Sequence, residues 1–150
     1  MCTVCSLQLS MARHHVTGLN ETETKLIVGI EPADEASAAA AAVQLQEKHG
    51  CNDVLITLGK AGCYYRRKAD GHGAFAPPCP AVAVDTSGAG DCFLGSLAFY
   101  LAKYPDLTLE EMLSRCNHIA AISVQSKGTQ SSYPTRAEVP PALLMPASTP

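Results

Sequence analysis

The sequence of 150 residues lacks a surplus of basic side chains. It has 11 Lys and Arg against 14 Asp and Glu, which gives a formal net charge of −3, and its isoelectric point is near 5.9. Binding to nucleic acids or to anionic membrane surfaces is driven mainly by positive charge. We therefore expect no nucleic-acid partner.

The sequence also lacks long apolar runs and a regular cysteine pattern. No apolar run approaches the ~18 residues of a membrane span, and "MCTVCSLQLSMARHH" has no basic region before its short apolar stretch. We expect neither a membrane span nor a signal peptide. The seven cysteines are odd in number and irregularly spaced, which favours reduced thiols and a cytoplasmic or nuclear location. Cys2 and Cys5, followed by His14 and His15, could form half of a zinc site, but no second cysteine pair lies nearby and the terminus is expected to fray, so zinc is not predicted.

The composition is that of one soluble globular domain, with 47% hydrophobic and 17% charged residues. Helix and strand signals alternate along the chain, which predicts an α/β layered fold. Helices are expected over 21–30, 32–50, 89–103 and 108–125, and strands over 54–58, 63–67 and 82–84. The proline-rich segment 140–150 is expected to be a disordered tail.

The stretch "DTSGAGD" at residues 85–91 lies between a predicted strand and a predicted helix. The first N–H groups of a helix have no intrahelical acceptor and lie at the positive end of the helix dipole. Gly88 and Gly90 let a ligand approach this backbone closely, and Ala89 adds almost no bulk. The stretch therefore predicts an anion site.

Asp91 is an unusual neighbour for such a site, because its carboxylate repels a bound phosphate. Its presence is explained if it acts as a base on a hydroxyl that attacks phosphorus. A strand-to-helix turn, capped by Asp85 and Thr86 and shaped by glycines, explains the same residues without a function.

Four segments in order resemble the PfkB-type carbohydrate kinase family, and its ribokinase branch in particular. They are "NETE" at 20–23, "LITLGKAG" at 55–62, "DTSGAGDCFLGSLAFYLA" at 85–102 and "VQSKGTQSSYP" at 124–134. The resemblance predicts a partial ribokinase-like nucleotide-binding domain over 17–139, after an unmatched segment 1–16. The implied fold is the C-terminal half of a ribokinase-like, Rossmann-type layered α/β fold, without the N-terminal half and the β lid.

The resemblance implies an ATP-dependent kinase for ribose or a similar sugar, with Mg²⁺ and K⁺ as cofactors. It makes Asp91 the catalytic base and Gly88, Ala89 and Gly90 the anion hole. The implied nucleotide-binding residues are Asn20, Thr57, Leu58, Gly59, Lys60, Ala61, Gly62, Gly90 and Asn117. Glu23 is implied to bind Mg²⁺ through water. The implied K⁺ ligands are Asp85, Ser87, Ser123, Ser126, Gly128 and Ser132.

Some of these residues also fit purely structural roles. Asn20 and Glu23 fit a helix capping box, and Asn117 fits the polar side of an amphipathic helix. The resemblance also covers only about half of the usual family length, and the unmatched N-terminal half carries most sugar-binding residues. Three hypotheses follow for this chain: a sugar kinase, a truncated non-catalytic isoform that binds nucleotide or pairs with a full-length subunit, or a fragment too incomplete to fold stably. A homodimer is left open.

Overall fold

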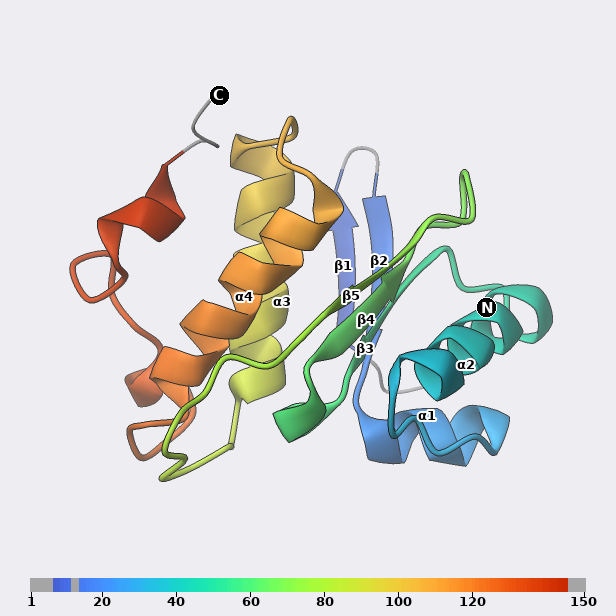
Figure 1. Ribbon diagram of the computed structural model, residues 1–150, viewed down its shortest axis with the longest axis horizontal. Coiled ribbons are helices and arrows are strands. Elements are labelled where there is room, and N and C mark those ends of the chain that lie inside the picture. Colours follow the sequence, from blue (N-terminus) through green and yellow to red (C-terminus); the bar gives the residue numbers. More distant parts are fainter. Residues whose placement is uncertain (1–6, 12–13, 146–150) are drawn as a thin grey trace. The chain divides into compact units, whose positions relative to one another are not determined.

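The computed structural model describes residues 7–11 and 14–145. The chain forms two compact units, Met1–Pro78 and Cys79–Pro150. The first runs from blue to green and the second from green to red in Figure 1. The boundary between them falls inside the segment 17–139 that the sequence predicts as one domain.

The first unit is built on a mixed sheet of five strands. In spatial order these are β1 (Leu7–Met11), β2 (His14–Leu19), β3 (Asp53–Thr57), β4 (Cys63–Arg66) and β5 (Gly73–Ala76). Strands β2 and β3 run parallel, with Leu19 opposite Ile56, and the other neighbours run antiparallel. The strands predicted over 54–58 and 63–67 are confirmed, whereas β1, β2 and β5 were not predicted.

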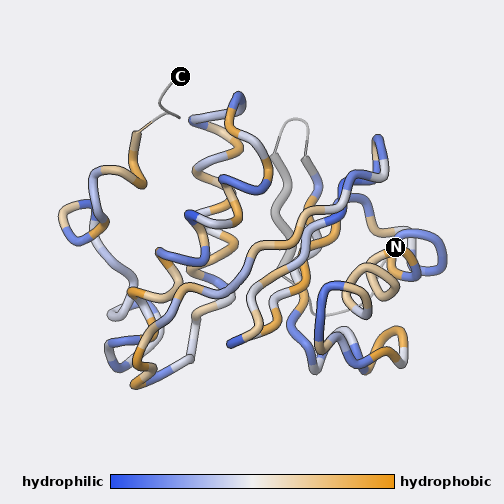
Figure 2. The backbone as a smooth tube through the Cα atoms, viewed as in Figure 1, coloured by the Kyte–Doolittle hydropathy of each residue, from blue (hydrophilic) through white to orange (hydrophobic). Residues whose placement is uncertain are grey.

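Helices α1 (Glu21–Val28) and α2 (Glu35–Lys48) cover one face of this sheet (Figure 1), and both predicted helices are confirmed. Helix α1 ends at Gly29, whose φ of 74° is favourable only for glycine. The body of α2 is mostly pale orange in Figure 2 because it is rich in alanine. It packs against the sheet through a shared core of Ala38, Ala41, Ala42, Leu45, Val54, Ile56 and Tyr64.

The second unit is built on two helices that pack side by side, α3 (Ala89–Lys103) and α4 (Leu109–Ser123) (Figure 1). Both were predicted. Thr108 is the N-cap of α4, as expected, and its hydroxyl accepts the Glu111 N–H at 3.2 Å. The apolar sides of the two helices are buried through Phe93, Leu97, Tyr100, Met112, Leu113 and Cys116.

The strand predicted over 82–84 is wrong. In the part of the chain that the structure describes, residues 81–86 belong to no strand. Val82 and Val84 are 83% and 55% exposed. The N–H groups of Val84 and Asp85 both donate to the Val124 carbonyl, at 2.7 and 3.1 Å. The apolar composition favoured a strand, but a strand requires a neighbouring strand, and the end of α4 takes its place here.

Of the predicted tail, the structure describes residues 140–145, whereas residues 146–150 lie outside the described part of the chain. Pro141–Leu144 forms a short 3₁₀ helix, η3. The Tyr100 hydroxyl donates to the Leu143 carbonyl at 2.8 Å, and the Arg115 guanidinium donates to the Met145 carbonyl. These donors belong to α3 and α4, so composition alone could not reveal that they hold the segment.

Two negative findings apply to residues 7–11 and 14–145. None of their helices combines the length and the hydropathy that crossing a bilayer requires. No disulfide joins the cysteines found there. Cys2 and Cys5 lie outside the described residues.

Candidate active site

The predicted site residues divide between the two units. Asn20, Glu23 and the loop Thr57–Gly62 belong to the first unit. The anion-hole residues, Asp91, Asn117 and the predicted K⁺ ligands belong to the second. In the first unit these residues lie after β2 and β3, and in the second most lie in the turn before α3 and the loop after α4. Asn117 is the exception, since it is half-buried in the middle of α4.

In the first unit, the predicted nucleotide residues follow the carboxyl ends of two adjacent parallel strands. Asn20 comes directly after β2, and the loop Thr57–Gly62 begins at the end of β3 (Figure 1). The two segments adjoin, because a Cβ on Gly59 would lie 3.0 Å from the Glu21 carboxylate. The Thr57 hydroxyl also lies 3.5 Å from the Leu19 carbonyl. In open α/β sheets, ligands bind at this edge.

The loop after β3 is a single backbone turn. Its 3₁₀ helix η1 (Gly59–Ala61) is closed by the Leu58 N–H, which donates to the Gly62 carbonyl at 2.8 Å. Gly59 and Gly62 have φ of 48° and 105°, a region that side chains other than glycine rarely adopt. A Cβ on Gly62 would also overlap the Ala76 carbonyl oxygen. The exposed Lys60 lies in this turn, where a cation suits a negatively charged ligand.

Asn20 and Glu23 form a complete capping box at the start of α1. The Asn20 side-chain oxygen accepts the Glu23 N–H, and Glu23 Oε2 accepts the Asn20 N–H, both at 2.9 Å. The structural role that the sequence also allowed is therefore present. Glu23 Oε1 takes no part in this pair, so the cap does not prevent contact with a hydrated cation.

Helix α3 begins differently. Its N-cap is Gly88, with φ of 79° and no side chain to accept a hydrogen bond. The Ala89 N–H donates to the Thr86 carbonyl at 3.2 Å. The N–H groups of Gly90 and Asp91 have no acceptor in the described part of the chain. The backbone N–H groups of Gly90 and Asp91 are therefore available to a ligand, whereas the Ala89 N–H is already bonded within the turn.

The surroundings of Gly90 are also open. A Cβ built on this residue would meet no atom within 4 Å, and the backbone there is exposed. An anion can thus approach the amides at the positive end of the α3 dipole. The predicted anion hole is consistent with this geometry.

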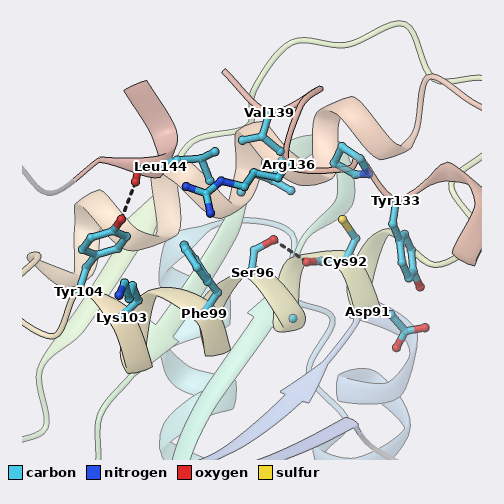
Figure 3. Close-up of a pocket in the computed structure, with 13 residues that line it drawn as sticks. Asp91, Cys92, Ser96, Phe99, Lys103, Tyr104, Tyr133, Arg136, Val139 and Leu144 are labelled. Carbon is cyan, nitrogen blue, oxygen red and sulfur yellow. Dashed lines mark hydrogen bonds between the residues drawn. The ribbon is translucent and has the colours of Figure 1, made fainter. Parts of the chain in front are cut away.

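The Asp91 side chain is exposed in the first turn of α3. Figure 3 shows the Tyr133 hydroxyl pointing toward its carboxylate. The pKa of Tyr133 is raised above the usual 10, first by burial and then by the negative charge of the neighbouring Asp91. The sequence did not single out Tyr133. Two features of the sequence could have drawn attention to Tyr133. It is the only Phe, Tyr or Trp after Tyr104, and it follows a Ser-rich loop.

A pocket of about 440 Å³ extends from Asp91 along α3 (Figure 3). One wall is the side of α3 that carries Asp91, Cys92, Gly95, Ser96, Phe99, Lys103 and Tyr104. The other wall includes Ile119, Tyr133, Pro134, Arg136, Val139 and Leu144. Its surface is mostly carbon, and the Ser96 hydroxyl is bound to the Cys92 carbonyl at 2.8 Å. Such a surface does not match the many hydroxyls of a sugar.

The predicted K⁺ ligands gather around Asp85. One carboxylate oxygen accepts the Ser87 N–H at 2.9 Å, and the other accepts the Gly128 N–H at 3.0 Å. The Gly128 amide, followed by the Ser87 amide and hydroxyl, holds the pKa of Asp85 below its usual value. The buried Ser123 and Ser132 donate their hydroxyls to the carbonyls of Ala120 and Thr129. Ser126 is exposed in the same loop.

The charge of Asp85 is compensated by amides and the Ser87 hydroxyl, and no basic side chain of the described residues pairs with it. Among residues 7–11 and 14–145, no three His, Cys, Asp or Glu side chains converge as they do at a transition-metal site. The surrounding groups are carbonyl and hydroxyl oxygens, which are the ligands of hard cations. The residues present therefore fit a hard cation rather than a transition metal.

Comparison with known proteins identifies the family. The model of the pfkB family carbohydrate kinases matches residues 7–136, so the match begins inside the segment 1–16 that the sequence left unmatched. Mouse ribokinase is 51% identical over 124 residues, which are 83% of this chain and 38% of the mouse protein. Haemophilus influenzae ribokinase is 41% identical over 119 residues, or 79% and 37% of the two chains.

Solved structures agree with this result. The structure of Arabidopsis thaliana ribokinase complexed with ribose and ATP has a TM-score of 0.73 and 29% identity, and the match covers 86% of this chain and 40% of that one. Thermotoga maritima ribokinase has a TM-score of 0.66 and 32% identity, covering 86% and 41%. The chain thus spans about two fifths of the length of these relatives. It belongs to the pfkB family of carbohydrate kinases.

Proposed function

We propose that this chain supplies the nucleotide-binding part and the catalytic base of an ATP-dependent kinase that phosphorylates ribose or a similar sugar. The observation that carries this proposal is the start of α3. Open amides of Gly90 and Asp91 and the exposed carboxylate of Asp91 occur there within one helical turn. Donors for a phosphoryl group and an acceptor for a proton are the two requirements of this reaction.

In the proposed reaction, a sugar hydroxyl attacks the γ-phosphorus of ATP. The hydroxyl oxygen forms the new bond to phosphorus, its proton passes to the Asp91 carboxylate, and the bond to the ADP oxygen breaks. The amides of Gly90 and Asp91 stabilise negative charge on the transferred group. Asp91 acts only as the proton leaves, so we expect it to affect turnover more than ATP binding.

On the nucleotide side, we assign the loop Thr57–Gly62 and Asn20 to ATP. Both lie at the carboxyl edge of β2 and β3, which supports the assignment. Glu23 would hold Mg²⁺ through water, and the ion would neutralise phosphate charge. We assign Asn117 to the adenine side on the family resemblance alone.

We further propose that Asp85 and the loop 123–132 hold K⁺. The ligands would be Asp85, Ser87, Ser123, Ser126, Gly128 and Ser132, mostly through oxygen atoms of the backbone and hydroxyls. The bonds from Ser87 and Gly128 to Asp85 already join the two segments. A bound monovalent cation would neutralise the carboxylate and stabilise the turn that leads into α3.

Ribose is proposed as the substrate because the mouse relative at 51% identity is a ribokinase. A cytoplasmic location is proposed from the odd number and irregular spacing of the cysteines. A second candidate is nucleotide binding without phosphoryl transfer, alone or beside a full-length subunit. It is favoured by the mostly carbon surface of the pocket next to Asp91, which offers few partners for sugar hydroxyls.

The deciding experiment incubates the purified chain with radiolabelled ATP, ribose, Mg²⁺ and K⁺, and measures MgATP binding by calorimetry in parallel. Labelled ribose phosphate that disappears in Asp91→Asn supports the kinase. MgATP binding without transfer supports the second candidate. A folded chain that does neither contradicts both.

A further inference from the structure

We propose that Tyr133 is a positioning residue that holds the Asp91 carboxylate in place for proton abstraction. The proposal rests on the proposed function of Asp91. Its basis is the place of Tyr133 directly after the short helix η2 (Gln130–Ser132). From there its side chain reaches the first turn of α3 (Figure 3).

The Tyr133 side chain contacts the N-cap of α3. A Cβ on Gly88 would lie 2.9 Å from the Tyr133 hydroxyl oxygen and 3.2 Å from a ring carbon. The tyrosine thus occupies the space that any side chain at position 88 would need. Glycine is therefore favoured at position 88 for two reasons, the space taken by Tyr133 and a φ of 79°.

Asp91 lies three residues after Gly88, and residues at this spacing share one side of a helix. Both Tyr133 and Asp91 line the end of the pocket at the start of α3, and in Figure 3 the phenol oxygen faces the carboxylate. A phenol that keeps its proton at neutral pH is a donor, and a carboxylate is an acceptor.

This contact would prepare Asp91 for its reaction. An exposed aspartate rotates freely about its side-chain bonds, whereas a donor that holds one carboxylate oxygen leaves the other at a defined place for the sugar hydroxyl. The other titratable groups lining this pocket are Cys92, Lys103, Tyr104 and Arg136. Burial raises the pKa of the Cys92 thiol, so it adds no negative charge near neutral pH.

The contact can be tested in the chain without any activity. Tyrosine labelled with ¹³C at the ring carbon that bears the hydroxyl gives one NMR signal for each of the five tyrosines, and Tyr133→Phe identifies the signal of Tyr133. We expect its pKa to fall toward 10 in Asp91→Asn and to stay unchanged in Tyr104→Phe. A Tyr133 pKa that is the same with and without Asp91 would overturn the proposal.

The consequence for catalysis is tested in the transfer assay. Tyr133→Phe keeps the ring and removes only the hydroxyl, and we expect kcat to fall about tenfold, the size of a lost hydrogen bond to a charged group. The KM for ATP should stay within about twofold. Tyr104→Phe is the matched control, because its hydroxyl binds the Leu144 carbonyl at 2.5 Å, away from Asp91.

An active Tyr133→Phe variant with unchanged kcat would also overturn the proposal. If the parent chain transfers no phosphate, the proposed function fails for this chain. The NMR titration still decides whether Tyr133 holds Asp91, so the two failures are distinguishable.

Discussion

Helices α1 and α3 both carry a carboxylate three residues after the N-cap, but only α1 has a side-chain cap for its first N–H groups. The carboxylates are Glu23 after Asn20 and Asp91 after Gly88. In α1 the two residues satisfy each other's backbone N–H groups. In α3 the N-cap has no side chain, two amides stay open, and the carboxylate lines a pocket.

The difference shows that the N-cap residue decides whether a helix start is closed or available to a ligand. A side-chain cap typically contributes about 1 kcal/mol to stability, and α3 does without it. Buried side chains along α3, such as Phe93 and Leu97, offset the missing cap. A start that is less stable but open is what an anion-binding helix requires.

The largest expected effect comes from the carboxylate of the open start. We expect Asp91→Asn to lower kcat by about 10²–10⁴-fold, the usual loss for a general base, while the KM for ATP stays nearly constant. The assay can use a chimera in which this chain replaces the matching segment of mouse ribokinase. A variant within about twofold of the parent would show that Asp91 only caps the helix.

A substitution of Glu23 tests whether the capped start of α1 also binds Mg²⁺. Glu23→Gln keeps a capping-box residue but removes the charge, so we expect the Mg²⁺ concentration for half-maximal activity to rise about tenfold. The free energy of unfolding should hardly change. Glu21→Gln removes a charge from the same turn and should leave the Mg²⁺ dependence as it was. Equal behaviour of the two variants would reduce Glu23 to a cap.

Asn20→Ala separates capping from nucleotide binding. Losing an N-cap costs about 1 kcal/mol of stability, and we expect weaker MgATP binding in addition. Asp34→Ala is the matched control, because Asp34 caps α2 through the same kind of box. It should lose similar stability, measured by urea unfolding, without a change in MgATP affinity. A control that binds as weakly as Asn20→Ala would contradict the assignment.

The smallest expected effect concerns Asp85, in the turn that leads into α3. Its pKa in the folded chain lies below the ordinary 3.8, so its ionised form contributes stability above that pH. The contribution is lost as the pH falls through the lower folded-state value. We expect the melting temperature of the parent to exceed that of Asp85→Asn at pH 6, and the gap to narrow below pH 3.8. A constant gap from pH 6 to pH 3 would rule out this linkage.

The sequence was sufficient for elements with strong local signals. Thr108 followed by acids predicted α4, alanines predicted α2, and the run over 54–58 predicted β3. It was insufficient where partners distant in the sequence decide the structure. Strand β5 has four residues, Gly73–Ala76, and exists through pairing with β4. The apolar run 82–84 has no strand partner among the described residues and forms a loop instead.

The candidate site shows the same division. Motif residues such as Gly90 and Asp91 were found because their chemistry depends on local backbone geometry at a helix start. Tyr133 was missed because its role depends on a contact across about 40 residues, from the loop after α4 to the first turn of α3. No local pattern predicts such a contact.

The central claim is that the open start of α3 receives the phosphates of ATP, and one pair of titrations tests it directly. Gly90 and Gly95 both lie on α3, and a Cβ on either would meet nothing within 4 Å, so the Cβ of a valine has room at both positions. Calorimetry should show MgATP binding at least about tenfold weaker in Gly90→Val and unchanged in Gly95→Val. Parental affinity in a folded Gly90→Val variant would contradict the account.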